Sequence, residues 1–556
     1  MFLEICFKYT RRDYSQCNGG IMNFFPKKLA SAAALTVLVS LTIFGTPAVQ
    51  ANTSNKLVSV AVNSNGDLSA EAKQFYAKRN FNPIWVGRKN KARAKALIEA
   101  VSSAAEHGLP KSQYQLAKLR SALNSRRSNL DATAEMFATQ IFLKYAHDLS
   151  SGILKPKRVS KEIAVQVPRR SELALLDAIS RSNPTGFFKA LVPKHPEYSR
   201  LLEEKQRLEL LLMKGGFGKT IRSETLKPGI SNENITKVRA RLSAMKYGRL
   251  GNDPDYDDRL RIVVQQFQLD HGLKPDGIIG PGTIKVLNAS AEQRLKQVII
   301  NLERERWMNR SRGNRHIVVN LADFSLSIYD DDRVTFTSNT VVGKIGKDRT
   351  PEFHDQMTHM VVNPTWHVPK SITGKEYLPM LKEDPAFLAN NGMWMVDING
   401  EAVQPVDVNL DEYDETSFPY SIKQKPSKSN ALGLVKFMFP NKHNIYLHDT
   451  PSKNLFSREV RAFSHGCVRV QKPFEFAYKL LEKQTSDPIS VFHSFLKTGA
   501  EQYVNLQLPV PIYIVYRTAF FAENGRVNFR NDIYGRDKII FNALNKAGVA
   551  LTSVSG

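Results

Sequence analysis

The chain has 556 residues, of which 42% are hydrophobic and 24% are charged, a balance typical of soluble globular proteins. Its length exceeds what one hydrophobic core supports, so we expect several domains. Lysine and arginine outnumber aspartate and glutamate by 78 to 53, and the resulting net charge of +25 favours contact with an anionic polymer or a membrane surface. No nucleic-acid-binding motif accompanies this charge, and we do not expect nucleic acid as a partner.

The N-terminal segment 1–51 carries the pattern of an export signal. Downstream of Met22, two lysines precede the apolar stretch 29–44, and Val49-Gln50-Ala51 has the small residues of a cleavage site. We expect cleavage at this site and a periplasmic mature protein. A retained inner-membrane anchor is the alternative, and the shortness of the apolar stretch disfavours it.

The cysteines are divided unevenly between the leader and the rest of the chain. Cys6 and Cys17 precede Met22, in a segment that does not fit an export signal and belongs to the protein only if translation starts at Met1. The exported chain then contains Cys467 alone, so it cannot form an internal disulfide. Such a thiol is either buried and inert or reactive, and its sequence neighbours bear on that choice.

Residues 52–228 are predicted to form a helical scaffold domain. Amphipathic runs rich in alanine and leucine, such as 91–106 and 130–149, alternate with breaks that contain glycine, proline or serine. This part of the sequence has no catalytic constellation.

A second helical unit is predicted over 232–290. Apolar residues at helical spacing flank a long loop, and the sequence DGIIGP marks a turn before a third helix. The pattern VRARL, followed by LRIVVQQFQLDHGLKPDGIIGPGTIKVLN, resembles small three-helix peptidoglycan-binding domains. A generic helical bundle is the alternative reading.

Residues 294–497 show β-type alternation after an amphipathic helix at 294–307. A turn-rich stretch at about 371–435 is predicted to be an insertion that forms a lid, because loops of that length in compact domains are usually functional. Further predictions are a helix at 473–482, a strand at 489–493 and a β extension over 498–556 that packs on this β-rich domain or on the scaffold.

The residues that carry chemistry lie in one short window, YLHDTPSKNLFSREVRAFSHGCVRV at 446–470. Cys467 needs a nearby base to act as a nucleophile, and His448 supplies an imidazole of suitable pKa. Gly466 permits a tight turn whose N–H groups can hold an oxyanion. Arg469, two residues beyond the cysteine, would face the same side of a strand and could bind a carboxylate.

At these residues the sequence resembles a known family. The motif H-D-T-P followed by S-H-G-C-V-R-V is similar to the signature of the L,D-transpeptidases, most specifically over 429–471. The resemblance implies a multidomain α+β protein with a helical scaffold, a peptidoglycan-binding domain and a β-rich sandwich catalytic domain (YkuD-like) with an inserted lid. The domain order is similar to that of the large Gram-negative branch. Ser427 departs from the pattern, where we expect glycine.

The resemblance also implies a role for each residue. Cys467 attacks the carbonyl between the diamino acid of a peptidoglycan stem and its terminal D-alanine, while His448 takes and later returns the proton. The backbone carbonyl of Asp449 orients the imidazole, and the N–H groups of Gly466 and Cys467 stabilise the oxyanion. The residues expected to shape the pocket or contact the substrate are Arg469, Tyr446, Ser464 and His465.

The implied partners are a donor tetrapeptide and an acceptor amine from a second stem, with no cofactor and no metal. Weak contact with the membrane surface or the anionic wall is possible on charge grounds. β-lactams of the carbapenem type are expected to inhibit covalently through Cys467. With water as the acceptor, the same site would act as an L,D-carboxypeptidase.

Three other readings use the same residues. A papain-like protease is disfavoured because its cysteine precedes its histidine in the sequence. A zinc site is disfavoured because His448, His465 and Cys467 lack ligand spacing. A wall-binding protein with an inactive catalytic domain stays open, since the sequence cannot show turnover.

Overall fold

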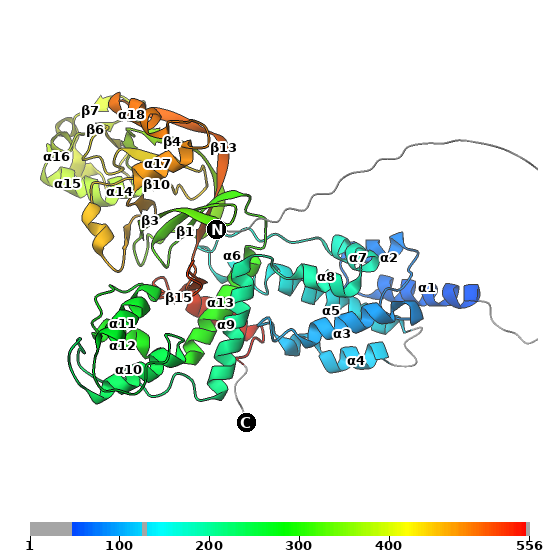
Figure 1. Ribbon diagram of the computed structural model, residues 1–556. Coiled ribbons are helices and arrows are strands. Elements are labelled where there is room, and N and C mark those ends of the chain that lie inside the picture. Colours follow the sequence, from blue (N-terminus) through cyan, green and yellow to red (C-terminus); the bar gives the residue numbers. More distant parts are fainter. Residues whose placement is uncertain (1–46, 125–130, 552–556) are drawn as a thin grey trace, which may run out of the picture. The chain divides into compact units, whose positions relative to one another are not determined.

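The computed structural model describes residues 47–124 and 131–551, with side chains from residue 55 onward (Figure 1). The predicted export signal lies almost entirely outside the described residues. The chain divides into two units, 1–51 and 52–556, and nearly all described residues belong to the second. Among the described helices, none combines the length and the apolar character that a membrane crossing requires.

The scaffold part is helical, and most of its helices enclose one apolar core, while α6 and α9 pack on a second core that includes α13 (Ala291–Trp307). A buried carboxylate organises this core: Glu135 accepts the backbone N–H groups of Ile84, Trp85 and Val86 at 2.7–3.0 Å. Without these bonds the turn before α3 would leave its donors unsatisfied. The helices are α1 (Pro47–Ser64), α2 (Ala70–Lys78), α3 (Lys91–Ser102), α4 (Leu116–Asn124), α5 (Ala132–Ser151), α6 (Pro156–Val159), α7 (Glu172–Arg181), α8 (Pro184–Leu191) and α9 (Pro196–Met213).

The next helices, α10 (Glu233–Ala244), α11 (Asp258–Asp270) and α12 (Pro281–Leu287), surround a separate apolar core. Gln268 on α11 fixes the DGIIGP turn, because its side chain accepts the N–H of Gly277 at 2.8 Å and donates to a carbonyl beyond it. In this three-helix region, the DGIIGP turn is therefore held by a side chain of the preceding helix, α11.

The β-rich part contains a sheet in the order β11-β3-β12-β10-β9-β4-β13-β1-β2. Strand β3 also pairs with β2, so the sheet closes on itself around the largest apolar core, which helices α17 (Pro473–Leu481) and α18 (Pro488–Lys497) complete. The multidomain α+β class is confirmed. The strands are β1 (Arg315–Asn320), β2 (Ser325–Asp330), β3 (Arg333–Gly343), β4 (Phe353–Val362), β9 (Val435–Met438), β10 (Leu447–His448), β11 (Ala462–Ser464), β12 (Val468–Val470) and β13 (Gln502–Val515).

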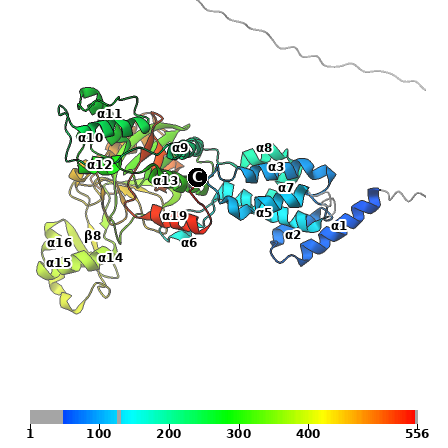
Figure 2. The same cartoon turned by 90° about the horizontal axis from the view of Figure 1, so that it is seen from below.

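The segment predicted as a lid is a folded subdomain with its own apolar core, which includes Trp366, Leu381 and Ile422. Its sheet has the order β5-β8-β6-β7, and its helices are seen beside β8 in Figure 2. It begins before the predicted boundary. The elements are β5 (Trp366–His367), α14 (Lys370–Ile372), a π-helical turn (Thr373–Tyr377), α15 (Leu378–Glu383), α16 (Phe387–Asn390), β6 (Met393–Val396), β7 (Ala402–Val403) and β8 (Ser421–Gln424).

Helix α13 (Ala291–Trp307) differs from the simple amphipathic helix that its sequence suggests. Its charged C-terminal residues are buried and point to different parts of the chain. Glu303 accepts the backbone N–H of Leu154 in the scaffold at 2.8 Å. Arg304 donates to Asp537 at 2.6 Å. Because these side chains are polar partners for neighbouring elements, the helix has no wide solvent-facing side at this end.

One expectation for the C-terminal third is wrong. Residues 489–493 lie in helix α18, since Asp487 caps it by accepting the N–H of Ser490 and Pro488 occupies its first position. The stretch 498–556, predicted as a β extension, contributes strands to the β-rich part and also contains a helix. Strand β13 lies inside the main sheet between β4 and β1, and only β14 (Ala519–Phe521), β15 (Val527–Phe529) and α19 (Arg536–Lys546) follow it.

A buried ion network connects α19 to the β-rich part and supplies a stability prediction. Arg536, 1% exposed, bonds Glu352 and Glu162 at 3.1 Å each. Arg536→Met should leave the buried Glu352 without this partner and lower the free energy of unfolding by about 3–5 kcal/mol. Chemical denaturation of the full chain measures this. The exposed neighbour Lys538→Met is the control, and equal losses in both variants would contradict the assignment.

Candidate active site

The site is built on two short parallel strands. In the pairing of β10 with β12, Leu447 lies opposite Val468 and His448 opposite Arg469. Leu447 and Val468 point into the main apolar core. Because side chains alternate along a strand, His448 and Arg469 point to the opposite face.

The same pairing continues one residue further, since the N–H of Val468 donates to the carbonyl of Tyr446 at 3.1 Å. Tyr446 and Cys467 are therefore neighbours on the face that carries His448 and Arg469. Tyr446 also packs against the core of the lid subdomain. The four side chains form a square in which Cys467 lies beside Tyr446 and diagonally across from His448.

The loop that carries the cysteine is braced by hydroxyl groups. Ser464 accepts the N–H of Gly466 at 3.1 Å and donates to the carbonyl of Cys467 at 2.5 Å. Thr350 donates to the carbonyl of Gly466 at 2.7 Å. Gly466 has φ +117°, which a side chain would strain. Its N–H, predicted to hold an oxyanion, is thus already bonded to Ser464.

The sulfur of Cys467 faces polar groups on two sides. Its Sγ lies 3.7 Å from the carbonyl oxygen of Asn444, to which the thiol donates. The hydroxyl of Tyr446 bonds the sulfur and in turn accepts the indole N–H of Trp366 from the lid subdomain. Burial raises the pKa of the Cys467 thiol to about 11, and the Tyr446 bonds and the Arg469 charge act against that rise.

The imidazole of His448 is held as a neutral base. Its Nδ1 lies 2.5 Å from the carbonyl oxygen of Asp449, so Nδ1 carries the proton and Nε2 keeps its lone pair. Burial, together with the neighbouring Arg469 and Lys436 charges, lowers the pKa of His448 to about 3. Lys436 is opposite His448 in the pairing of β9 with β10, so the ring lies between two cations.

The carboxylate of Asp449 fixes the loop behind this histidine. It accepts the N–H of Leu434 at 2.9 Å and that of Thr450 at 2.7 Å. Gly433 is required here, because a Cβ at that position would come within 2.3 Å of the Asp449 carboxyl group. Ser427 does not adopt a positive φ, so the departure from the expected glycine places no strain on the nearby loop.

A cavity of about 1180 Å³ lies over these side chains. Its walls include Trp366 and Ile372 of the lid subdomain and Asn444 of the loop before β10. Asp449 and Gly466 do not line the cavity, and their backbone groups bond His448 and Ser464. The other sequence-predicted residues all line the cavity: Tyr446, His448, Ser464, His465, Cys467 and Arg469.

His465 connects the cysteine loop to the lid subdomain. Its Nε2 lies 2.6 Å from Glu376 of the π-helical turn and 2.8 Å from Lys344 at the end of β3. One nitrogen cannot donate to the carboxylate and accept from the ammonium at once, so the two bonds are alternatives. The sequence did not identify Glu376, Lys344, Lys436 or Trp366, because each is far from the motif and none has a distinctive spacing.

The contact between Tyr446 and the sulfur yields a prediction. The phenol stabilises the thiolate, so Tyr446→Phe should raise the thiol pKa and slow alkylation of Cys467 by iodoacetamide at every pH below about 11. Mass spectrometry of the peptide that contains Cys467 measures the rate. Tyr503→Phe, which alters a phenol that is 64% exposed, should leave the rate unchanged. Faster alkylation of the Tyr446 variant would show that the phenol does not stabilise the thiolate.

Comparisons with known proteins assign parts of the chain to families. Residues 314–491 match the L,D-transpeptidase catalytic domain family (YkuD), residues 231–287 match the "putative peptidoglycan binding domain" family, and residues 70–204 match a scaffold domain family. A protein of Haemophilus influenzae described as "Putative L,D-transpeptidase" is 34% identical over 224 residues, which are 40% of this chain and 45% of that protein. The chain thus aligns with less than half of that relative.

Two solved structures are also similar. An L,D-transpeptidase from Xylanimonas cellulosilytica has 15% identity and a TM-score of 0.17, with 53% of this chain and 100% of that one covered. An L,D-transpeptidase from Stackebrandtia nassauensis has 13% identity and a TM-score of 0.22, with 53% and 96% covered. Scores this low carry no argument about arrangement, so the assignment depends on the family matches. Residues 314–491 match the L,D-transpeptidase catalytic domain family, in a chain that also matches a putative peptidoglycan-binding domain family and a scaffold domain family.

Proposed function

We propose that this chain is a peptidoglycan L,D-transpeptidase that cross-links stem peptides through a thioester on Cys467 and so serves cell-wall biogenesis. The observation that carries the proposal is the square of Tyr446, His448, Cys467 and Arg469 on one sheet face beneath a cavity of about 1180 Å³. The match of residues 314–491 to the catalytic domain family supplies the class of reaction.

Acylation begins with a neutral pair, because the pKa of Cys467 is about 11 and that of His448 about 3. The sulfur attacks the donor carbonyl that precedes the terminal D-alanine, and its proton passes to Nε2 of His448 as the S–C bond forms. The carbonyl of Asp449 accepts a hydrogen bond from Nδ1–H throughout and stabilises the imidazolium that forms briefly. The C–N bond then breaks, and D-alanine leaves with the proton from His448.

The oxyanion formed during attack needs donors close to the sulfur. The N–H of Gly466 is engaged by Ser464, so we assign this role to the N–H of Cys467 and the hydroxyl of Tyr446. Trp366 bonds the Tyr446 hydroxyl and orients it from the lid side.

The second half-reaction transfers the acyl group to an amine of another stem. The amine attacks the thioester carbonyl and gives a proton to His448, and the C–S bond breaks to restore the thiol. The cavity exceeds the roughly 300–1,000 Å³ typical of single-ligand pockets, which suits a site that must admit donor and acceptor peptides together.

Arg469 is suited to hold a substrate carboxylate. Its guanidinium lines the cavity, and its Nε has no hydrogen-bond partner among the described residues. Burial lowers the pKa of this guanidinium, and a carboxylate beside it would recover the lost stabilisation.

The peptidoglycan-acting domains indicate that the chain works outside the cytoplasm. We assign it to the periplasm on the pattern of an export signal before residue 52. Carbapenem-type β-lactams, which present a strained carbonyl to the nucleophile, are the expected covalent inhibitors at Cys467.

The central test uses the nucleophile itself. Cys467→Ala should abolish both D-alanine release from tetrapeptide muropeptides and carbapenem acylation, because no other side chain can form the thioester. Chromatography with mass spectrometry follows both. The matched control, Ser494→Ala, removes an exposed hydroxyl of α18 outside the cavity and should retain full activity.

The products separate the alternatives. Dimers with release of D-alanine support the transpeptidase, whereas free tripeptides alone would identify a carboxypeptidase. An acyl adduct on the Cys467→Ala chain, or no turnover by the wild-type chain, would refute the proposal.

A further inference from the structure

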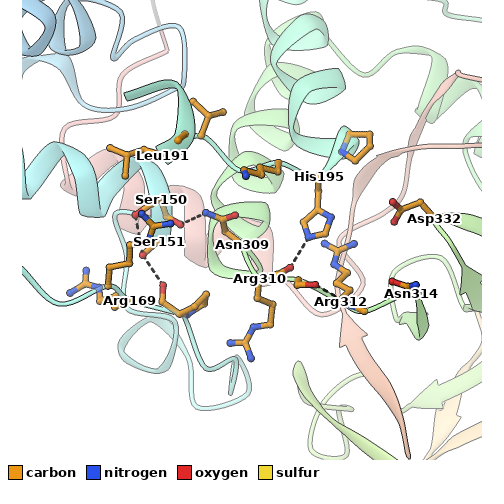
Figure 3. Close-up of a pocket in the computed structure, with 18 of the residues that line it drawn as sticks. Ser150, Ser151, Arg169, Leu191, His195, Asn309, Arg310, Arg312, Asn314 and Asp332 are labelled. Atoms are coloured by element: carbon orange, nitrogen blue, oxygen red, sulfur yellow. Dashed lines mark hydrogen bonds between the residues drawn. The ribbon is translucent and has the colours of Figure 1, made fainter. Parts of the chain in front are cut away.

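A second large cavity lies away from the cysteine. It has a volume of about 750 Å³ and shares no lining residue with the cavity over Cys467. One wall comes from the scaffold, at the end of α5, the loop 168–170 and the loop 190–196. The other comes from the segment 309–314 and the turn at Asp331 and Asp332 (Figure 3).

The lining is rich in cations from both walls. Arg169, Arg170 and Lys194 come from the scaffold and are exposed, while Arg310 and Arg312 come from the segment between α13 and β1. Side chains this far apart in the sequence meet only because the scaffold packs against the start of the β-rich part. The arrangement provides several separated donors for oxyanions within one enclosed volume.

The two arginines of the second wall are held in place yet incompletely bonded. Arg310 donates to the backbone carbonyl of Gln166 and lies 2.5 Å from Nε2 of His354. Arg312 bonds Glu305 at 3.1 Å. The Nε atoms of Arg310 and Arg312 are nevertheless buried without a partner among the described residues, and desolvation lowers the pKa of both guanidiniums.

The cavity also has an acidic end. Asp331 and Asp332 form the turn between β2 and β3, with φ values of +49° and +61°, and the N–H of Asp331 bonds the carbonyl of Asn314 at 2.7 Å. This bond fixes the turn relative to the arginine segment. A ligand that carries only negative charge would meet repulsion at this end, whereas one that also bears an amine would find a partner there.

We propose that this cavity binds a peptide with at least two carboxylates and one ammonium group, separately from the site at Cys467. The carboxylates bond the arginines, and the ammonium lies against Asp331 and Asp332. The identification of that peptide as a peptidoglycan stem, which holds the polymer at a second point, rests on the proposed function. The volume of about 750 Å³ accommodates a short peptide and greatly exceeds what a single phosphate needs.

Hydrogen–deuterium exchange of the full-length Cys467→Ala chain tests this without turnover. A tetrapeptide muropeptide should protect the segments 166–172 and 309–315. Arg169→Ala with Arg170→Ala should raise the muropeptide concentration for half-protection at least tenfold. The matched control, Arg88→Ala with Lys89→Ala, removes the same charge from an exposed scaffold turn outside the cavity. It should change the muropeptide concentration for half-protection less than twofold.

The outcomes are distinguishable. Protection of 463–470 alone would overturn the second site and leave the proposed function intact, whereas protection of 166–172 and 309–315 alone would support the second site and count against binding at Cys467. If the control variant weakened the protection equally, the effect would come from net charge alone, and the second site would be overturned. Equal protection by inorganic phosphate at the same concentration would overturn the assignment to a peptide.

Discussion

The parallel pairing of β10 with β12 is the constraint on which the chemistry of this chain depends. Both strands are short, and the register places His448 opposite Arg469 while Leu447 and Val468 face the main core. A slip of one residue would bury the imidazole and expose leucine to the cavity. The apolar partners therefore hold the catalytic face in place, and the core of the β-rich domain does more for the site than any single polar contact within it.

This arrangement favours a resting site without charge separation. Burial raises the pKa of Cys467 to about 11, while burial and two flanking cations lower that of His448 to about 3. Each change disfavours the ionised form, so the thiol and the imidazole remain neutral until a substrate carbonyl begins to accept electrons. In the proposed reaction, the carbonyl of Asp449 and the hydroxyl of Tyr446 would lie beside the charges that arise at that moment, which is where such groups lower a barrier.

The sequence predicted which side chains gather at the candidate site better than it predicted their surroundings. Cys467 and His448 stood out because the motif joins residue types that one reaction needs, and the helical and β-rich parts followed from periodicity. Trp366 and Lys436 could not be found, because their approach to the site depends on strand pairing across long separations. The helix at 488–497 was mistaken for a strand although Asp487 and Pro488 are a standard helix start. The burial of the charged residues of α13 could not be predicted, because their partners lie far away in the sequence.

The protonation state of His448 tests this account most directly. Nuclear magnetic resonance of the full chain with labelled histidine, and with His448 assigned by substitution, would follow its ring nitrogens as the pH falls. The account predicts a neutral ring with the proton on Nδ1 from neutral pH down to the limit of the folded state, in line with a pKa of about 3. An imidazolium at neutral pH would mean that the resting site is charged, and a midpoint near 6.5 would mean that burial does not lower the pKa of His448; either result would contradict the account.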